Sequence, residues 1–429
     1  MCHAEKLFAS IILQRIRNRT EEILTESQAG FRRGRSTIDQ LFTLRLLMEK
    51  YSEFSNSLYI CYIDYQKAFD SVWREGLWHV MSHLGYEKKI IRLLMALYKD
   101  TFSAVRVDGE LTDWFKTLVG VLQGCVLSPL LFCIFLEVVM ARALDVEDMG
   151  AVVSGRSISN LKFADDIALI AESSTDLQSL LDGVDAESNR FGLTVSKAKT
   201  EAQCIPPEDQ PLMTNIGGVT LKQTKDFVYL GGKISDTVGS GADVERRIGL
   251  ATGVARSMAE IWKAKDIMTS TKVRLYNTLV LSVLLYNAET WTMKEELRRK
   301  LLVFEMTVLR RIAGVTRWDR CRNADIREKL GIGRDIVNRV RAKRLSYFGH
   351  VVRMQPARTP NILLYGRVHG RRPVGRPKKR WLDNIREDCL IMGITEEEAD
   401  HIARDRGLWS RAVYRLLERV DEQSMSRTH

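Results

Sequence analysis

The 429-residue sequence lacks the features of a membrane or secreted protein. No stretch approaches the roughly 18 uninterrupted apolar residues of a membrane-spanning helix, and the best candidate, LLFCIFLEVVMA, is short and contains Glu137. The first residues, MCHAEKLFAS, do not have the charged, apolar and cleavage regions of a secretory signal. The seven cysteines are scattered and form neither a CxxC pair nor a zinc-like Cys/His pattern. We therefore expect reduced thiols and a location in the nucleus or the cytoplasm.

The composition is that of a basic, globular protein. Hydrophobic residues make up 45% of the chain and charged residues 28%, so we expect packed domains rather than disorder. The length favours two or three of them. Lys and Arg number 65 against 54 Asp and Glu, which gives a net charge of +11. This excess favours a polyanionic partner, nucleic acid before an anionic membrane surface, and we expect no membrane partner.

The character of the sequence changes along the chain, which has no internal repeat of fixed period. Up to about residue 240, strand-like alternation such as SLYICYIDY is mixed with helical patterns. From 243 to 350, apolar residues recur at helical spacing and strand patterns fade. Between 361 and 380 there are seven basic residues and no acidic one, with several Gly and Pro. We predict an α+β fold divided into a mixed part (1–240), a helical part (241–355) and a basic C-terminal region (356–429).

Two carboxylate positions stand out in the mixed part. Asp64 ends a predicted strand, and Asp165 and Asp166 lie at the turn of a predicted hairpin, LKFADDIALIA. Clustered carboxylates repel one another unless a cation intervenes, and hard oxygen ligands suit Mg²⁺ or Mn²⁺. Two such ions can hold the attacking and leaving oxygens of a phosphoryl transfer. The alternative is a solvated Asp-Asp turn, and the FADD motif alone does not decide between them.

The order of the motifs favours the metal site. YIDYQKAFDSV is followed by GVLQGCVLSPLLF, LKFADDIALI, GLTVSKAKT and FVYLGG, and ESQAGFRRGRSTIDQL precedes them all. Together these motifs resemble those of reverse transcriptases, most closely the enzymes of non-LTR (LINE-type) retrotransposons, over about residues 5–235. The resemblance implies a right-hand polymerase with fingers, an antiparallel palm sheet and a helical thumb. It implies an RNA-directed DNA polymerase that uses an RNA template, a DNA primer, dNTPs and two Mg²⁺ or Mn²⁺ ions.

The resemblance also assigns roles to residues of this chain. Asp64, Asp165 and Asp166 match the metal ligands, and Lys199 matches a lysine that acts as general acid for the leaving pyrophosphate. Phe69 matches the aromatic residue that excludes a 2′-hydroxyl, and Asp70 is expected to cap or orient the next helix. The other residues expected at the nucleotide are Tyr65, Gln123, Gly124, Arg32 and Arg35.

Two further regions are expected to contact nucleic acid. FVYLGG resembles the primer-grip hairpin of the family, which points to Tyr229, Leu230 and Gly231. The basic C-terminal motif RRPVGRPKKRW is expected to contact phosphates, with Trp381 stacking on a base. Its candidate residues are Arg371, Arg372, Arg376, Lys378, Lys379 and Arg380. A nuclear-localisation signal and a loose linker remain alternatives for this motif.

Some positions depart from the family pattern. Leu122 stands where the family usually has Arg, and Ser196 stands where Asn is more common. The first fingers strands and the endonuclease domain that usually precede these motifs are not in the sequence, so we expect an N-terminally truncated copy or a fragment. A catalytically inactive, nucleic-acid-binding remnant is therefore the alternative function. The sequence predicts no oligomeric state.

Overall fold

The computed structural model describes residues 3–144, 149–207, 212–375 and 378–426, without the side chains of 418–426. The chain forms two compact units. The first consists of Met1–Gln40, Phe54–Lys225 and Arg367–Arg371, and the second of Leu41–Glu53, Asp226–Gly366 and Arg372–His429. Helix α2 (Thr37–Glu53) begins in the first unit and continues into the second. Among the described residues, no helix combines the length and apolar composition needed to cross a membrane.

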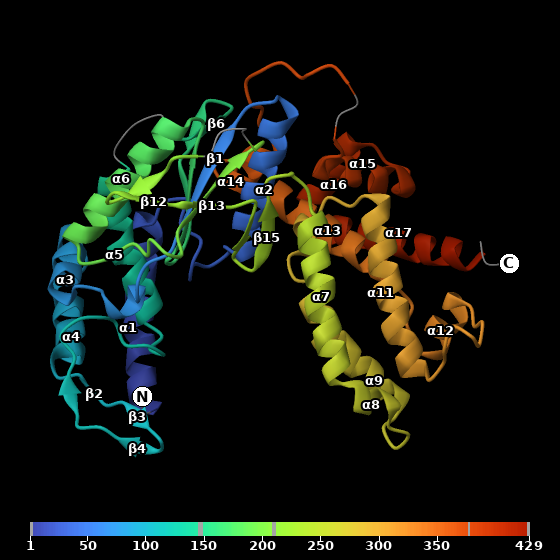
Figure 1. The fold of residues 1–429 in the computed structure, drawn as a ribbon, viewed down its shortest axis with the longest axis horizontal. Coiled ribbons are helices and arrows are strands. Elements are labelled where there is room, and N and C mark those ends of the chain that lie inside the picture. The colour runs from blue at the N-terminus through green and yellow to red at the C-terminus, as the bar shows by residue number, and fades with distance from the viewer. Residues whose placement is uncertain (1–2, 145–148, 208–211, 376–377, 427–429) are drawn as a thin grey trace. The chain divides into compact units, whose positions relative to one another are not determined.

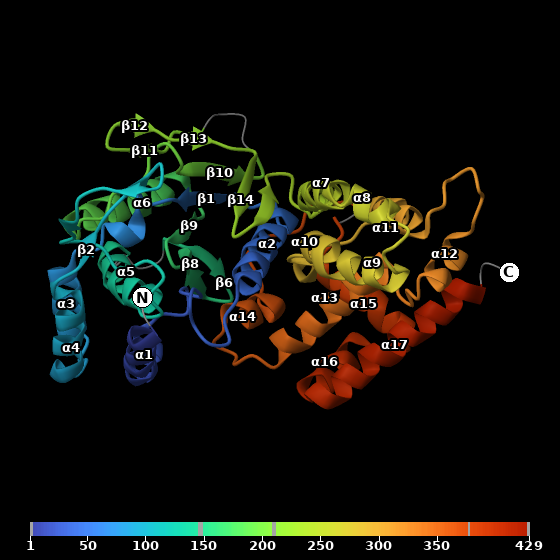
Figure 2. The same ribbon diagram turned by 90° about the horizontal axis from the view of Figure 1, so that it is seen from below.

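A five-stranded sheet forms the centre of the first unit, in the order β13-β10-β1-β9-β8 (Figure 2). The predicted strand in SLYICYIDY is β1 (Leu58–Ile63), and all of its residues are buried. It pairs antiparallel with β9 (Asp166–Ala171) on one side and with β10 (Glu201–Ile205) on the other. Strand β8 (Asn160–Phe163) extends the sheet beyond β9, and β13 (Lys222–Gln223) pairs parallel with β10.

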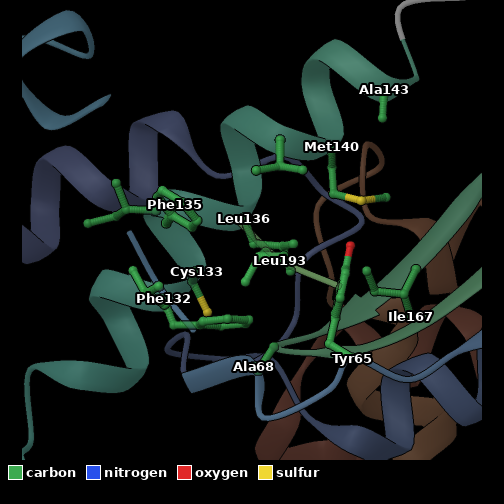
Figure 3. Packing of buried hydrophobic residues seen from close by; sticks show 14 of the residues in the cluster. Tyr65, Ala68, Phe132, Cys133, Phe135, Leu136, Met140, Ala143, Ile167 and Leu193 are labelled. Atoms are coloured by element: carbon green, nitrogen blue, oxygen red, sulfur yellow. The ribbon is translucent and has the colours of Figure 1, made fainter. Parts of the chain in front are cut away.

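Two helices pack against this sheet. Helix α6 (Ser174–Arg190) contacts β1 and β9, and α5 (Ser128–Ala143) packs on α6. Helix α5 is apolar almost all round and begins with Pro at its first turn, where a missing N–H costs nothing. Figure 3 shows its side chains, including Phe132 and Leu136, in one core with Tyr65 and Ile167. This core fixes the end of the sheet at which the predicted aspartates lie.

Shorter elements complete the first unit (Figure 1). The predicted Asp-Gly hairpin is present, because Asp108 and Gly109 both have positive φ between β3 (Arg106–Val107) and β4 (Glu110–Leu111). The remaining elements are α1 (His3–Ile23), η1 (Ala68–Asp70), α3 (Arg74–His83), α4 (Lys88–Lys99), β2 (Phe102–Ser103), β5 (Phe115–Lys116), β6 (Ala151–Val153), β7 (Arg156–Ile158), β11 (Asn215–Ile216) and β12 (Val219–Thr220).

The second unit is mainly helical, as the periodicity after residue 240 predicts. Its hairpin consists of β14 (Asp226–Tyr229) and β15 (Gly232–Ser235). The helices are α7 (Gly241–Ser257), α8 (Ala259–Lys263), α9 (Thr269–Leu275), η2 (Tyr276–Val280), α10 (Leu281–Leu284), η3 (Ala288–Thr290), α11 (Glu295–Ala313), α12 (Asn323–Lys329), α13 (Ile336–Val352), α14 (Thr359–Tyr365), α15 (Trp381–Met392), α16 (Glu396–Arg404) and α17 (Arg406–Ser426). The predicted three-part division of the chain stays a prediction.

Candidate active site

Asp64 directly follows the central strand and is held by the loop before β10. Its backbone N–H donates to Thr200 Oγ1 at 3.4 Å, and its carbonyl accepts from the Ser196 N–H at 2.7 Å. Lys199 Nζ lies 3.3 Å from Asp64 Oδ1 in an ion pair whose lysine is exposed. The structure therefore brings together two of the predicted catalytic residues, Asp64 and Lys199.

Asp165 and Asp166 lie at the tip of the β8–β9 hairpin, residues 160–171, which we call the aspartate hairpin. Phe163 pairs with Asp166, so Ala164 and Asp165 form the turn. Ala164 has φ 57°, a left-handed conformation that a residue with a Cβ rarely adopts. In the neighbouring strand pair, Ile63 lies opposite Ile167. Asp64 and Asp166, the residues after Ile63 and before Ile167, therefore lie at the same end of the sheet, next to the turn.

The three carboxylates are close enough for their charges to affect one another. Partial removal from water raises the pKa of Asp165, and the nearby Asp64 carboxylate raises it further. The pKa of Asp166 is raised to about 6 by loss of hydration, by Asp165 and by Asp64. Burial is the main cause of both shifts, and repulsion between the neighbouring carboxylates adds to it.

The donor set fits a divalent cation that shares its coordination with substrate. Among the described residues, no three His, Cys, Asp or Glu side chains are arranged to hold a metal ion by themselves. Mg²⁺ at phosphoryl-transfer sites is commonly bound by one or two carboxylates together with substrate phosphates and water. Asp64 and Asp165, beyond the ends of neighbouring strands, can supply such carboxylates, and the cation would relieve the repulsion that, after burial, raises the pKa of Asp165.

Tyr65 and Phe69 follow Asp64 and are fixed by the core. The Tyr65 ring is buried, and its hydroxyl lies 2.8 Å from Ser188 Oγ. Only the backbone of Tyr65, which follows Asp64 directly, is therefore near the site. Phe69 lies on the short helix η1, half-buried, with its ring stacked on Phe132 at a centroid distance of 4.6 Å. The inner face of the Phe69 ring is thus packed, which restricts its movement.

The loop that contains Gln123 and Gly124 is attached to the same short helix. The Val121 N–H donates to the Phe69 carbonyl at 2.8 Å, and Gln123 Nε2 donates to Asp70 Oδ1 at 3.1 Å. Gly120 has φ 84°, and a Cβ there would lie 2.7 Å from the Asp70 carbonyl oxygen. The structure therefore places Phe69 and Gln123 together. Asp70 was expected to cap or orient the next helix. The capping part is wrong, because α3 begins only at Arg74 and the Asp70 carboxylate accepts from Gln123, while the orienting part stays a prediction.

The two arginines predicted at the nucleotide already have protein partners. Arg32 is buried, pairs with Glu21 and donates to the carbonyl of Thr25 at 2.6 Å. Arg35 forms an ion pair with Glu26. Contact of Arg32 and Arg35 with phosphate stays a prediction, and the structure gives each of them a role within the protein.

Two residues that contact the site were not predicted from the sequence. Thr200 accepts the Asp64 N–H, and Gln28 Oε1 accepts the Ala164 N–H at 3.0 Å. Both bonds join segments 136 residues apart, so no local spacing in the sequence could have indicated them.

In the second unit, the predicted primer-grip hairpin is well formed. Leu230 and Gly231 both have positive φ and make a two-residue turn between β14 and β15. The Leu230 carbonyl accepts from the Tyr286 hydroxyl at 3.0 Å, and the Gly231 carbonyl accepts from Arg246 Nη1 at 3.1 Å. Tyr229 is buried, so a nucleic acid at this hairpin would meet the turn rather than the tyrosine ring.

The basic C-terminal motif is partly engaged in ion pairs. Arg372 and Arg380 pair with Glu53, and Lys379 pairs with Glu387. Arg371 and Lys378 are exposed, and Arg376 lies outside the described residues.

The expectation that Trp381 stacks on a base is wrong. Its side chain is only 2% exposed and lies edge-on to Phe42, with ring centroids 4.8 Å apart. The indole N–H donates to the Glu289 carbonyl at 2.9 Å. This is a core residue of the second unit, so its ring is not available to a nucleic acid.

Comparison with known proteins identifies the family of this chain. The family model described as reverse transcriptase (RNA-dependent DNA polymerase) matches residues 1–234. A transposon-derived protein of Caenorhabditis elegans is 27% identical over 61% of this chain and 98% of its own length. A probable RNA-directed DNA polymerase from transposon BS of Drosophila melanogaster is 27% identical over 67% of this chain, which spans only 32% of that protein. A telomerase structure from Candida albicans, in complex with a fragment of telomeric RNA, covers 71% of this chain and 54% of its own, at 11% identity and a TM-score of 0.45.

A mainly antiparallel sheet with three aspartates at one end is the arrangement expected of the palm of a template-directed polymerase, and it lies within residues 1–234, which the family model matches. The chain belongs to the reverse transcriptase family. Its relatives encoded by mobile elements confirm the predicted kinship with non-LTR retrotransposons. The predicted α+β, right-hand polymerase fold class is confirmed as well.

Proposed function

We propose that this chain catalyses RNA-directed DNA synthesis, adding dNTPs to a primer 3′-hydroxyl on an RNA template. The observation that carries the proposal is that Asp64 and Asp165 lie at the same end of the palm sheet, where burial and then the Asp64 charge raise the pKa of Asp165. Reverse transcriptases generally use divalent metal ions, and we propose two Mg²⁺ or Mn²⁺ ions here, with Asp166 supporting the ligands. When bound, such ions stabilise the attacking and the leaving oxygens of the transfer.

Other residues would then act on the nucleotide. Lys199 would give a proton to the leaving pyrophosphate, a role that its ion pair with Asp64 supports. The Phe69 ring, packed on Phe132, would occupy the space that a 2′-hydroxyl needs. Gln123 and Gly124 would contact the incoming nucleotide, since both are exposed and the space beside the Gly124 Cα is open. None of the six described cysteines is joined in a disulfide, which suits the nucleus or cytoplasm as the proposed compartment.

Primer extension tests this proposal. The purified chain is incubated with an RNA template, an annealed DNA primer, dNTPs and Mg²⁺ or Mn²⁺. We expect extension, and we expect Asp165→Asn to lower its rate by about 10²–10³-fold or more, because the variant loses charge that the transition state requires. Asp113→Asn, an exposed aspartate on the β4–β5 connection, is the matched control and should leave the rate unchanged.

Two outcomes would overturn the proposal. Primer extension by Asp165→Asn at the wild-type rate would contradict the assignment of Asp165 to the active site. Salt-dependent RNA binding without any nucleotide incorporation, at either metal, would favour the inactive, nucleic-acid-binding remnant instead.

A further inference from the structure

The aspartate hairpin is attached to a loop far away in sequence, residues 25–30. Here the chain runs beside β8 for a single residue pair, Gln28 and Lys162, in parallel orientation. The Lys162 N–H donates to the Ser27 carbonyl and the Ala29 N–H donates to the Lys162 carbonyl, each at 2.8 Å. These two bonds anchor the strand that leads into the turn.

The Gln28 side chain reaches past this bridge to the turn itself. Its Oε1 accepts the Ala164 N–H at 3.0 Å and the Gly30 N–H at 2.8 Å. Because both partners are backbone donors, the orientation of the amide is fixed: the reverse orientation would set donors against donors. Gln28 is fully buried, and its Nε2 has no hydrogen-bond partner in the described part of the chain. The side chain therefore contributes only its acceptor oxygen to this site.

Ala164 is the residue that needs such support. It adopts the left-handed conformation with φ 57°, which is unfavourable for alanine, and its carbonyl carbon is bonded to the nitrogen of Asp165. Gly30 packs directly against the turn, because a Cβ at Gly30 would lie 2.4 Å from the Ala164 nitrogen. Any movement of this nitrogen would move the backbone of Asp165 with it.

The loop that carries Gln28 is itself braced. Arg32 Nη1 donates to the carbonyls of Thr25 and Gln28, at 2.6 and 3.0 Å. The buried carboxylate of Glu137 accepts the Thr25 N–H at 3.1 Å. The acceptor is thus presented by a rigid support rather than by a mobile surface loop.

We propose that Gln28 is a positioning residue of the polymerase site, which holds the Ala164–Asp165 turn in the conformation that aims Asp165. Its relevance for synthesis rests on the proposed function. Gln28 touches neither substrate nor metal, and it acts only through the backbone of the turn.

The test compares Gln28→Met with Gln203→Met. Methionine has nearly the volume of glutamine but no acceptor. Gln203 is an equally buried glutamine of β10, accepts the Tyr62 hydroxyl at 3.0 Å and does not touch the turn. Both variants therefore lose buried hydrogen bonds, but only Gln28→Met releases Ala164.

The first measurement is hydrogen exchange of the peptide 160–170 in the protein alone. We expect exchange in this peptide to become roughly tenfold faster in Gln28→Met and to stay unchanged in Gln203→Met. Gln28→Glu keeps an acceptor for both N–H groups and should keep the protection. If Gln28→Met does not fold, Gln28→Asn serves instead, because its amide is one methylene too short to reach Ala164. Unchanged exchange in the folded variant that lacks the acceptor overturns the proposal.

The second measurement is primer extension. We expect Gln28→Met to lower kcat by roughly tenfold to a hundredfold with little change in KM for dNTP, because a misplaced ligand affects the reacting geometry more than binding. An equal loss of kcat in Gln203→Met would mean that general destabilisation causes the effect, and it would overturn the proposal. If the wild-type chain does not extend primers at all, the proposed function fails, while the exchange measurement still decides the role of Gln28.

Discussion

Lys162 and Glu137 form a buried ion pair, and breaking it is expected to destabilise the first unit strongly. Lys162 belongs to β8, and Glu137 interrupts the otherwise apolar helix α5. Their charged atoms are 3.0 Å apart, and the side chains are only 3% and 5% exposed. Glu137 also accepts the Thr25 N–H, so the pair joins the helix, the strand and the loop that supports the aspartate hairpin.

The magnitude follows from the burial. Lys162→Met leaves the Glu137 carboxylate buried without its cation, which typically costs about 3–5 kcal/mol. For a unit of about 150–250 residues, 1 kcal/mol corresponds to about 2–4 °C, so the thermal midpoint should fall by about 6–20 °C. Lys116→Met breaks the exposed pair with Asp100, at 3.3 Å, and should cost about 1 kcal/mol or less.

A double-mutant cycle separates the pair from the loss of packing. Glu137→Gln keeps an acceptor for the Thr25 N–H but removes the charge, and leaves Lys162 buried without a counter-ion. In the double variant, Lys162→Met with Glu137→Gln, no charge is left buried, so its stability should return to within about 2 kcal/mol of the wild type. The coupling energy is then about 3 kcal/mol or more.

Thermal unfolding of the four proteins gives the cycle, and hydrogen exchange of β8 and β9 assigns the transition to the first unit. Two results would refute the reasoning. A loss of less than about 1 kcal/mol in Lys162→Met would mean that water reaches Glu137. Additive single variants, with no recovery in the double variant, would mean that the cost comes from packing alone.

Three further predictions concern the site and the second unit. Phe69→Val should raise incorporation of ribonucleotides relative to deoxynucleotides by about tenfold or more, measured by competing dNTP and rNTP in primer extension, because the ring that blocks the 2′-hydroxyl is gone. Because the folded-state pKa of Asp166, about 6, lies above its unfolded value, the folded protein binds more protons near pH 5. Without divalent ions, thermal stability should therefore fall as pH rises from about 4 to 6, and Asp166→Asn should flatten this slope; an unchanged slope would contradict the shift. Trp381→Ala should cost about 3–5 kcal/mol in unfolding experiments yet leave RNA affinity unchanged, since the ring is in the core.

The residues around Asp64 could be predicted because their information is local. A strand pattern that ends in Asp64 and a hairpin pattern around Asp165 determine the strand ends, and antiparallel pairing then brings those ends together. The same holds for the Asp108–Gly109 hairpin, whose turn type follows from two neighbouring residues. Periods and turns are properties of short segments, so the sequence carries them directly.

The roles of Arg32 and Trp381 could not be predicted in this way. A guanidinium can donate to a phosphate or to a set of backbone carbonyls. Only the tertiary fold brings the carbonyls of Thr25 and Gln28 to Arg32. An indole beside a run of basic residues resembles a base-stacking platform, but the fold buries it against Phe42. For Trp381 the predicted partner was wrong, and for Arg32 the sequence did not show the carbonyl partners that the fold supplies.

Gln28 and Glu137 are two further residues whose structural roles could not be predicted from the sequence. Each is a polar residue whose purpose is invisible in the sequence, because its partners Ala164 and Lys162 are distant along the chain. A carboxylate in an apolar helix is costly unless a buried cation pairs with it. Lys162, two residues before Ala164 in the strand that enters the aspartate hairpin, is that cation. The buried charge and the candidate active site are therefore parts of one arrangement: the ion pair is bonded to the 25–30 loop through Thr25, and Gln28 of that loop accepts the Ala164 N–H in the turn that carries Asp165.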